Sequence, residues 1–529
     1  MLLSLCVLIA LPILSVLSSL FTEDGTHWAR MWDTTLPDYI GNSVLLMILT
    51  GLLATIIGTG TAWCVSMLDF PGRSVLSWAL ILPLAAPAYI VGYVYVDLLD
   101  YFGPLQSGLR QIFGWTDSDY GFPPIRSLPG AAFILGIVLY PYIYLLARTA
   151  FLEQSDSQWL AARSLGQTPV QAFLRVSLPA ARPAIMGGLA LVLMETLADF
   201  GVADYFGIPT FSTGIFRNWL AAGDRPAAMS LAAVMLLFVF LLVLLESVSR
   251  KGRVTTQGKS TRQSGRLPLS KGQGLLVTTV CALPAIFGFV IPCFALLSNV
   301  MTQMDQQSLE TFLTYAGNTI KLATIVTVLS LSIAIFLSYS NRHESSLLGR
   351  AAIRLSTLGY ALPGALLAVG LLYPLGGVDR SLTRWASSEW GWDQGLILSG
   401  TLIILAYALM VRFLTVSFNS VSSGFEKIPY SFDAAGRTLG LSPARLITRI
   451  HLPLLRSSLS AGLILVFIDV LRELPATLIL RPFNFETLAT RVYWLASDER
   501  LVEASPAALL IILIGIIPVI WLNRRAENS

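Results

Sequence analysis

Two apolar stretches of this chain carry acidic side chains where a membrane-spanning helix would hold them. The stretches read LVLMETLADFGVADYFG and LVFIDVLRELPATLIL, and their acids include Glu195, Asp199, Asp469 and Glu473. In each stretch the named acids are four residues apart, which places both on one helix face. Carboxylates are hard oxygen ligands for highly charged cations, and a charge at the bilayer centre costs about 2.5 to 3.5 kcal/mol. The pattern indicates either a cation path or gate, or internal charges that hold helices together, with Arg472 as one partner.

The sequence contains no catalytic or nucleotide-binding pattern. The histidines His27, His343 and His451 fall in three different extramembrane segments, and we interpret His451 as a surface or packing residue. The four cysteines lie in apolar runs without metal-ligand spacing. No GxxxxGK[ST] phosphate loop occurs. We therefore expect a transporter and not an enzyme, with no catalytic residue, no cofactor bound by this chain and an unknown metal-ligand set.

The composition is that of a membrane protein. The 529 residues are 55% hydrophobic and only 12% charged, and the mean hydropathy is +0.70. Apolar runs of about 20 residues, enough for a helix to cross a bilayer, recur along the chain. We expect an all-α integral membrane protein with about 12 transmembrane helices. The expected spans are 2–20, 41–68, 74–97, 130–151, 183–206, 227–248, 275–298, 316–340, 351–374, 395–418, 456–480 and 504–523. The first run has no basic segment before it, and we interpret it as a retained span and not a signal peptide.

The distribution of Lys and Arg predicts the orientation of these spans. With the N-terminus in the cytoplasm, the cytoplasmic segments hold roughly twice as many basic residues as the opposite side. Both termini are then cytoplasmic, and the longest outer loops of the first half are 98–129 and 207–226. The net charge of +4 reflects this topology, so we expect a lipid bilayer and no nucleic acid as a partner.

The chain consists of one unit written twice. A basic, Gly- and Ser-rich stretch, 250–274, has seven basic residues and no acid, which is typical of a cytoplasmic linker. It separates a first repeat, 1–249, from a second, 275–529. A shift of 274 residues lays ARSLGQTPVQAFLRVSLP on GRTLGLSPARLITRIHLP with seven identities in eighteen positions. Because each repeat has an even number of spans, the two six-helix repeats are parallel.

Each copy of this repeated stretch is predicted to form an elbow, two short helices joined by a bend. Gly166 can end one helix at positive φ, and Thr168 with Pro169 can cap and begin the next. Gly440, Ser442 and Pro443 occupy the corresponding positions of the second copy. We expect the second helix to lay one apolar stripe against the bundle, formed by Val170, Phe173, Leu174 and Leu178 in one copy and Ile447, Ile450 and Leu452 in the other. Two copies on one face favour a docking platform for two identical partners; a simple connector between spans is the alternative.

These elbows resemble the Glu-Ala-Ala loop of permease subunits of binding-protein-dependent ABC importers. In that family the loop forms the coupling helix, which fits a groove on the ATP-hydrolysing subunit. The resemblance assigns this role to Ala161, Ala162, Arg163, Gly166 and Pro179 in one repeat and to Ala435, Arg437, Gly440 and Pro453 in the other. The chain departs from the family at its acidic position, which is Leu160 in one repeat and Ala434 in the other. Asp433, one residue earlier, is a candidate substitute.

The segments after the elbows, ADFGVADYFGIPTFSTGIFRNW and LRELPATLILRPFNFETLATRVYW, resemble those of fused, double-length ferric iron permeases. This resemblance implies a bacterial inner membrane location, two copies of an ABC ATPase subunit that use ATP, and a periplasmic substrate-binding protein. Independently of this resemblance, the spacing of the acids leads us to expect that Glu195, Asp199, Asp469 and Glu473 line or gate the translocation path. Permeases for thiamine, polyamines or inorganic anions remain alternatives, and a secondary transporter with two parallel halves is a further one.

Overall fold

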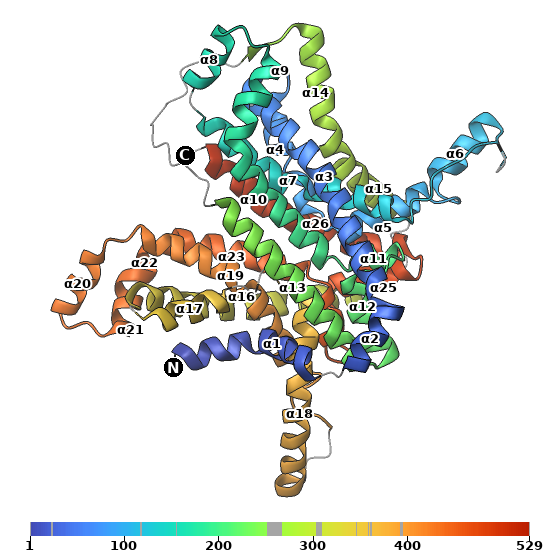
Figure 1. The fold of residues 1–529 in the computed structure, drawn as a ribbon. Coiled ribbons are helices and arrows are strands. Elements are labelled where there is room, and N and C mark those ends of the chain that lie inside the picture. The colour runs from blue at the N-terminus through green and yellow to red at the C-terminus, as the bar shows by residue number, and fades with distance from the viewer. Residues whose placement is uncertain are drawn as a thin grey trace. The chain divides into compact units, whose positions relative to one another are not determined.

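The computed structural model is built almost entirely from helices (Figure 1). It describes residues 2–22, 25–116, 119–154, 156–250, 267–302, 309–344, 346–357, 359, 362–391 and 395–527. The strands described are β1 (Leu68–Asp69) and β2 (Leu267–Pro268), which pair in parallel. Most of the expected linker, residues 251–266, lies outside the described residues.

The sequence up to the expected linker forms thirteen α-helices and three short helical turns of other types. Their bounds are α1 Leu2–Thr22, α2 Gly25–Thr34, α3 Leu36–Met67, α4 Arg73–Ala79, η1 Leu82–Ala85, α5 Ala88–Leu99, α6 Pro104–Phe113, α7 Leu128–Glu153, α8 Asp156–Ser164, α9 Pro169–Ala172, η2 Phe173–Ser177, α10 Leu178–Ala198, α11 Gly201–Tyr205, α12 Phe211–Phe216, η3 Arg217–Ala222 and α13 Arg225–Arg250.

The rest of the chain, from residue 267, has a similar order of long and short helices. Its helices are α14 Lys271–Ala285, η4 Ile286–Val290, α15 Ile291–Thr302, α16 Leu309–His343, α17 Leu347–Ser356, α18 Gly364–Trp390, α19 Leu402–Glu426, α20 Tyr430–Thr438, α21 Pro443–Leu446, η6 Ile447–His451, α22 Leu452–Leu454, α23 Arg456–Leu471, α24 Pro475–Leu480, α25 Leu488–Ser497 and α26 Leu501–Glu527.

The expected spans correspond to helices that are long and apolar enough to cross a membrane. Within the described residues there are 10 such helices, or up to 12 if each of two bent pairs counts as one span. The expected span 74–97 is bent by 91° between residues 85 and 88, where Pro87 adopts an extended conformation that ends the preceding turn. The expected spans 183–206 and 456–480 are each interrupted near their ends, after Ala198 and Leu471. Most of the expected spans fall on these helices, but the breaks were not predicted. The expected span 351–374 is wrong as one continuous helix, because α17 ends at Ser356 and α18 begins at Gly364.

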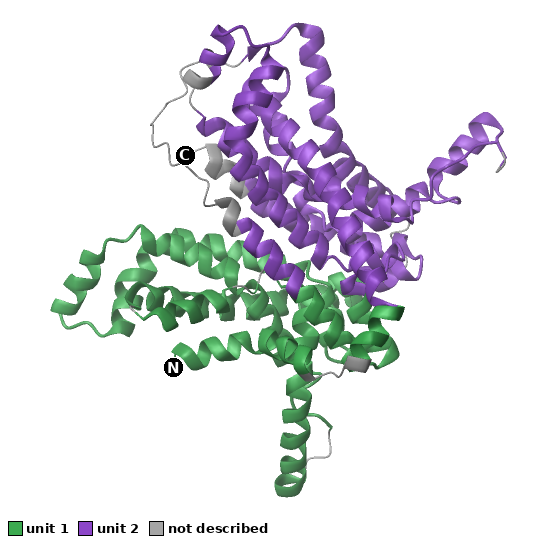
Figure 2. Cartoon of the chain, in the orientation of Figure 1, with its two compact units in different colours: residues 1–34, 214–236, 307–491 green, residues 35–213, 237–306, 492–529 purple. Residues whose placement is uncertain are grey.

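Contacts sort the helices into two compact units (Figure 2). Unit 1 comprises residues 1–34, 214–236 and 307–491, and unit 2 comprises 35–213, 237–306 and 492–529. In unit 1, α1 packs against α17 and α18 from the other end of the sequence, and in unit 2, α26 packs against α15 and η1. Each unit therefore combines parts of both sequence repeats, and the boundaries 1–249 and 275–529 stay a prediction about the sequence.

Each unit has a core of three helices at corresponding places in the two repeats. In unit 2 these are α3, α7 and α10, and in unit 1 they are α16, α19 and α23. Glycines allow the backbones of unit 2 to approach closely: a β-carbon at Gly58 would lie 2.8 Å from the Tyr140 carbonyl oxygen, and one at Gly188 would lie 2.7 Å from the Ile143 Cα. Small residues at helix contacts are typical of membrane bundles. These cores position the elbows at one end of α10 and α23 and the acids at the other.

Candidate functional site

The first elbow has the predicted backbone. Helix α8 ends just before Gly166, which adopts φ +82°, and the N–H of Gly166 donates to the carbonyl of Arg163 at 3.0 Å. The Thr168 hydroxyl then accepts from the N–H of Gln171 at 3.2 Å, and the Gln171 side chain accepts from the N–H of Thr168 at 3.0 Å. This reciprocal capping box begins α9 with Pro169 as its first residue. The bend predicted from glycine, hydroxyl and proline is confirmed.

The second elbow repeats the glycine bend and the hydroxyl cap, with Arg445 where the first elbow has Gln171. Gly440 adopts φ +74° after α20, and its N–H donates to the carbonyl of Arg437 at 3.0 Å. The Ser442 hydroxyl accepts from the N–H of Arg445 at 3.5 Å, and Pro443 begins α21. Among the residues expected to couple, Arg163, Arg437, Ala435 and Pro453 are exposed, whereas Ala162 is buried. The sequence therefore encodes one backbone motif at two places.

A leucine that the sequence analysis did not single out stands at the tip of each elbow. Leu165 and Leu439 immediately precede the two glycines, and their exposed fractions are 82% and 81%. The predicted single apolar stripe is wrong for the first elbow, because Val170 and Leu174 are exposed. Only Phe173 of that set packs inward on aromatic rings, with ring centroids 4.8 Å from Trp63. Turning apolar residues outward leaves each elbow with exposed hydrophobic surface.

Asp433, the candidate substitute for the family's acid, is turned inward. It is 4% exposed, and its Oδ2 accepts from Arg342 Nε at 2.9 Å and lies 2.7 Å from Arg342 Nη2. Its Oδ1 lies 2.9 Å from His451 Nε2. His451 is completely buried, so it is a packing residue with a polar partner, not a surface residue. Asp433 therefore holds the elbow to the protein and does not present a charge to a partner.

Arg342 connects this carboxylate to the ends of three helices. Its Nη1 donates to the carbonyl of Phe425 at 2.9 Å and its Nη2 to that of Ile428 at 2.8 Å, and its guanidinium lies 4.0 Å above the ring of Tyr430. Burial by itself would raise the pKa of Asp433, but the hydrogen bond and charge of Arg342, with those of His451, outweigh it and hold the pKa below its ordinary value. We call Arg342, Asp433 and His451 the elbow cluster. It ties α20 and η6 to the ends of α16 and α19.

The first elbow is attached differently. At the positions that match Asp433 and His451 the first repeat has Trp159 and Ser177. The Ser177 carbonyl accepts from the Gln154 side chain at 2.8 Å, and Phe173 packs near Phe151 with centroids 6.2 Å apart. The two elbows thus share a backbone while apolar contacts dominate at one and buried charges at the other.

Asp199 and Glu473 act as caps of equivalent short helices. Asp199 Oδ2 accepts from the N–H groups of Val202 at 3.1 Å and Ala203 at 3.0 Å at the start of α11. The two oxygens of Glu473 accept from the N–H groups of Ala476 and Thr477, both at 3.1 Å, at the start of α24. A carboxylate at a helix N-terminus satisfies N–H groups that have no partner within the helix. This repeated geometry explains why an acid stands after each break.

The second repeat adds arginines to this arrangement. Arg412 Nη1 lies 3.2 Å from Glu473 Oε1. Arg472, which the sequence suggested could pair with one of the acids, pairs with Asp469. Gly364, the first residue of α18, leaves space for the first pair, because a β-carbon there would collide with both the Arg412 and Glu473 side chains. In the first repeat Val138 replaces Arg412, and Ala88 follows the capping proline where Gly364 does. The buried ion pair of Arg412 and Glu473 therefore belongs to the second repeat and has no counterpart at the matching positions of the first.

The four acids are divided between the units. Glu195, half-buried on α10, and Asp199 belong to unit 2, whereas Asp469 and Glu473 belong to unit 1. The expectation that the two pairs meet at one axis and line the path stays a prediction. Within the described residues, no group of three or more His, Cys, Asp or Glu side chains is arranged to hold a metal ion.

Sequence reasoning missed Arg342 and Arg412. Arg412 lies inside the expected span 395–418, where an isolated arginine costs free energy unless it is paired, so it signalled a buried acidic partner. Arg342 follows the expected span 316–340 in a polar stretch and gave no such signal. The partner's identity needed the fold, because the pairs are separated by 91 and 61 residues.

Comparison with known protein families gives a match to each repeat. Residues 54–251 and 330–528 match the model of the binding-protein-dependent transport system inner membrane component. The chain belongs to this family. As a permease of this family it is a multi-pass inner membrane protein and the membrane component of a transport system that works with a binding protein.

Relatives of this permease include double-length and single-length proteins. The Fe(3+)-transport system permease protein FbpB 2 of Haemophilus influenzae is 25% identical over 92% of this chain and 90% of its own length. The ferric transport system permease protein FbpB of Actinobacillus pleuropneumoniae is 22% identical over 83% of this chain and 64% of its own length. The sulfate transport system permease protein CysT of Salmonella typhimurium is 25% identical over 46% of this chain and 87% of its own length. The fused architecture is thus shared with ferric permeases, and the single repeat is shared more widely.

Proposed function

We propose that this permease is the membrane-spanning subunit of an ATP-driven importer for ferric iron. Two copies of an ATPase subunit dock at the two elbows on the cytoplasmic side, and a periplasmic binding protein delivers the substrate to the opposite side. The ferric assignment is supported by double-length relatives that carry ferric transport in their names. The hard carboxylate chemistry beyond the elbows is compatible with a ferric cation.

The equal exposure of Leu165 and Leu439 is the observation that carries the docking proposal. An apolar side chain more than four-fifths exposed at the tip of a polar bend gains nothing from the fold of its own chain. The same residue at the same place in two repeats offers identical contacts to two identical partners. The bends at Gly166 and Gly440, with the hydroxyl caps that follow them, place each leucine at the tip of its elbow.

The docking proposal predicts that charged residues at these tips uncouple the complex. The double variant Leu165→Asp with Leu439→Asp is expected to reduce ATPase co-purification at least about tenfold, since placing a charge in an apolar contact costs more than about 1.4 kcal/mol. Pull-down of the ATPase by the tagged permease in detergent measures this. Phe102→Asp is the matched control, because Phe102 is 88% exposed but lies outside the elbows, next to α6. Equal ATPase binding by the double variant and the control would reject the elbows as docking sites.

The ferric proposal predicts selective stimulation by one loaded binding protein. The permease and its ATPase are reconstituted in liposomes, and ATP hydrolysis is measured with binding proteins loaded with ferric iron, thiamine, a polyamine or sulfate. We expect ferric-loaded protein to stimulate ATP hydrolysis and the other three to leave it at the basal rate. Stimulation by the sulfate-loaded protein alone would assign the chain to an anion, as for the sulfate permeases that it resembles.

A further inference from the structure

A cluster of phenols and one carboxylate lies in unit 2, beyond the break after α10. Tyr93 of α5 and Tyr205 of α11 have ring centroids 4.5 Å apart, and the Tyr493 hydroxyl of α25 donates to Asp204 Oδ2 at 2.8 Å. Asp204 and Tyr205 are neighbours on α11, so these two contacts join the four residues into one group. We call these four residues the phenol cluster. Because α10 runs about 30 Å from the elbow to α11, the cluster lies at the far end of the bundle from the ATPase docking site.

One hydroxyl in this group is unsatisfied. Tyr93 is completely buried, and its hydroxyl oxygen has no hydrogen-bond partner among the residues that the structure describes. Burying a hydroxyl without a hydrogen bond costs about 1 to 3 kcal/mol in proteins. A phenylalanine would fill the same space without that cost. Packing alone therefore does not explain why position 93 is a tyrosine.

The fold does not require these oxygens, because the same places in the other unit are apolar. Counted from the capping prolines Pro87 and Pro363, Tyr93 corresponds to Val369. Counted from the start of the capped short helices, Asp204 and Tyr205 correspond to Leu478 and Ile479. Tyr493 stands three residues after a bonded threonine pair, Thr487 and Thr490, as Phe216 does after Thr210 and Thr213. The repeat therefore builds this site with four apolar side chains in unit 1 and with four oxygen-bearing ones in unit 2.

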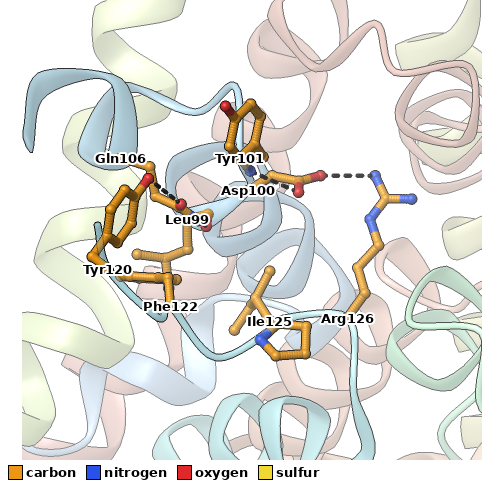
Figure 3. Close-up of a pocket in the computed structure, with 9 residues that line it drawn as sticks. Leu99, Asp100, Tyr101, Gln106, Tyr120, Phe122, Ile125 and Arg126 are labelled. Carbon is orange, nitrogen blue, oxygen red and sulfur yellow. Dashed lines mark hydrogen bonds and ion pairs between the residues drawn. The ribbon is translucent and has the colours of Figure 1, made fainter. Parts of the chain in front are cut away.

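Charged groups connect the phenol cluster to the outer loop 98–129. The guanidinium of Arg126 lies 5.1 Å from the ring of Tyr205 and pairs with Asp100 at 3.6 Å and Glu499 at 3.5 Å. Asp100 and Arg126 line a pocket of roughly 310 Å³, in which Figure 3 shows their ion pair. Asp97 is exposed on α5, one turn after Tyr93. Arg110 also reaches the pocket, where its Nη1 donates to the hydroxyl of Tyr120 at 2.8 Å. The acids Asp97, Asp100, Asp204 and Glu499 still outnumber these two arginines, which favours a cation over an anion.

We propose that Tyr93, Asp204, Tyr205 and Tyr493 form a transit site that binds the ferric substrate through oxygen before it passes into the membrane. Phenolate and carboxylate oxygens are hard ligands of the kind that a trivalent iron prefers. On binding, each phenol that ligates iron releases its proton to water, and the hydrogen bond from Tyr493 to Asp204 is replaced by two oxygen–iron contacts. Iron stays ferric throughout, so no reductant is needed. This proposal rests on the proposed ferric function and assigns a place to its substrate.

Tyrosines around a carboxylate can also hold an organic cation, through the faces of their rings. The two modes differ in what they need from the side chain. Cation–π binding needs only the ring and survives replacement of tyrosine by phenylalanine, whereas iron ligation needs the oxygen. The unsatisfied Tyr93 hydroxyl favours ligation through oxygen.

The test compares tyrosine-to-phenylalanine variants in the complete reconstituted complex. The triple variant of Tyr93→Phe, Tyr205→Phe and Tyr493→Phe is expected to lose ferric uptake at least about tenfold, since even supporting residues of metal sites change affinity by this amount. Purified permease mixed with ferric citrate is expected to show a visible phenolate-to-iron charge-transfer band that the triple variant lacks. Tyr140→Phe is the matched control, because Tyr140 is another buried tyrosine whose hydroxyl has no described partner. It should retain both uptake and the band.

Two readouts separate failure of this site from failure of the proposed function. Ferric-loaded binding protein should still stimulate ATP hydrolysis by the triple variant, because docking does not involve the buried phenols. Normal ferric uptake by the triple variant would overturn the transit site and leave the proposed function intact. Absence of ferric-stimulated ATP hydrolysis in the unmodified complex would overturn the proposed function instead. Uptake of thiamine or a polyamine that is unchanged in the triple variant would identify the cluster as an aromatic cage and also reject the iron site.

Discussion

Replacement of Glu473 by alanine is expected to destabilise the permease by about 3 to 5 kcal/mol, the range found when one partner of a buried ion pair is removed. Glu473 is 6% exposed, and without it the Arg412 guanidinium stays buried with one partner fewer. The N–H groups of Ala476 and Thr477 also lose their acceptor. Thermal unfolding in detergent, followed by tryptophan fluorescence, measures the effect as a large fall in Tm.

The first repeat supplies the control for this variant. Asp199→Ala removes the equivalent cap, but Val138 stands where Arg412 does, so the expected loss is only about 1 kcal/mol, as for an N-cap residue. Adding Arg412→Ala to Glu473→Ala should recover part of the lost stability by removing the orphaned charge, in the manner of a double-mutant cycle. Equal destabilisation by Glu473→Ala and Asp199→Ala would mean that the ion pair contributes nothing beyond the cap.

Asp433→Ala is expected to be comparably severe, with a loss of about 3 to 5 kcal/mol, because it leaves the buried Arg342 guanidinium without its carboxylate. It should also loosen the second elbow, since the elbow cluster joins α20 and η6 to the ends of α16 and α19. ATP hydrolysis should then continue with less substrate carried per ATP, which ³²P release and uptake measured together would reveal. Arg437→Ala is the control, because Arg437 is exposed on the same elbow and lies outside the elbow cluster. Tight coupling in Asp433→Ala would contradict the proposed mechanical role.

The stability that Asp433 contributes should fall as the pH becomes acidic. The folded-state pKa of Asp433 lies below its ordinary value of 3.8. A carboxyl with a depressed pKa contributes stability that is fully present above the unfolded pKa and is lost as the pH falls through the folded pKa. The contribution of Asp433 should therefore be constant at neutral pH and disappear only below about pH 4. The difference in Tm between the parent and Asp433→Asn should therefore shrink in that acidic range.

The parts of the site that could be predicted from sequence are local. The elbows follow from glycine at positive φ, a hydroxyl cap and proline at the first helical position, all within a few residues of one another. A pairing of Arg472 with one of the acids was an alternative for the same reason, and its partner is Asp469, three residues earlier. The inward orientation of the Asp433 side chain could not be predicted, because the sequence shows an acid in a polar stretch without showing which helix packs against it.

By itself the sequence determined that the chain spans a membrane, that it is one unit written twice, and where each copy bends. These features depend on the length of apolar runs and on backbone preferences of neighbouring residues, which act without knowledge of the rest of the fold. The tertiary structure decided which buried charges have an oppositely charged partner and which side-chain oxygens lie close together. Arg342 meets Asp433 across 91 residues, and Tyr493 meets Asp204 across 289. A buried charge or hydroxyl is stable only beside a partner, and for these groups the partner is chosen by helix packing and not by position along the chain.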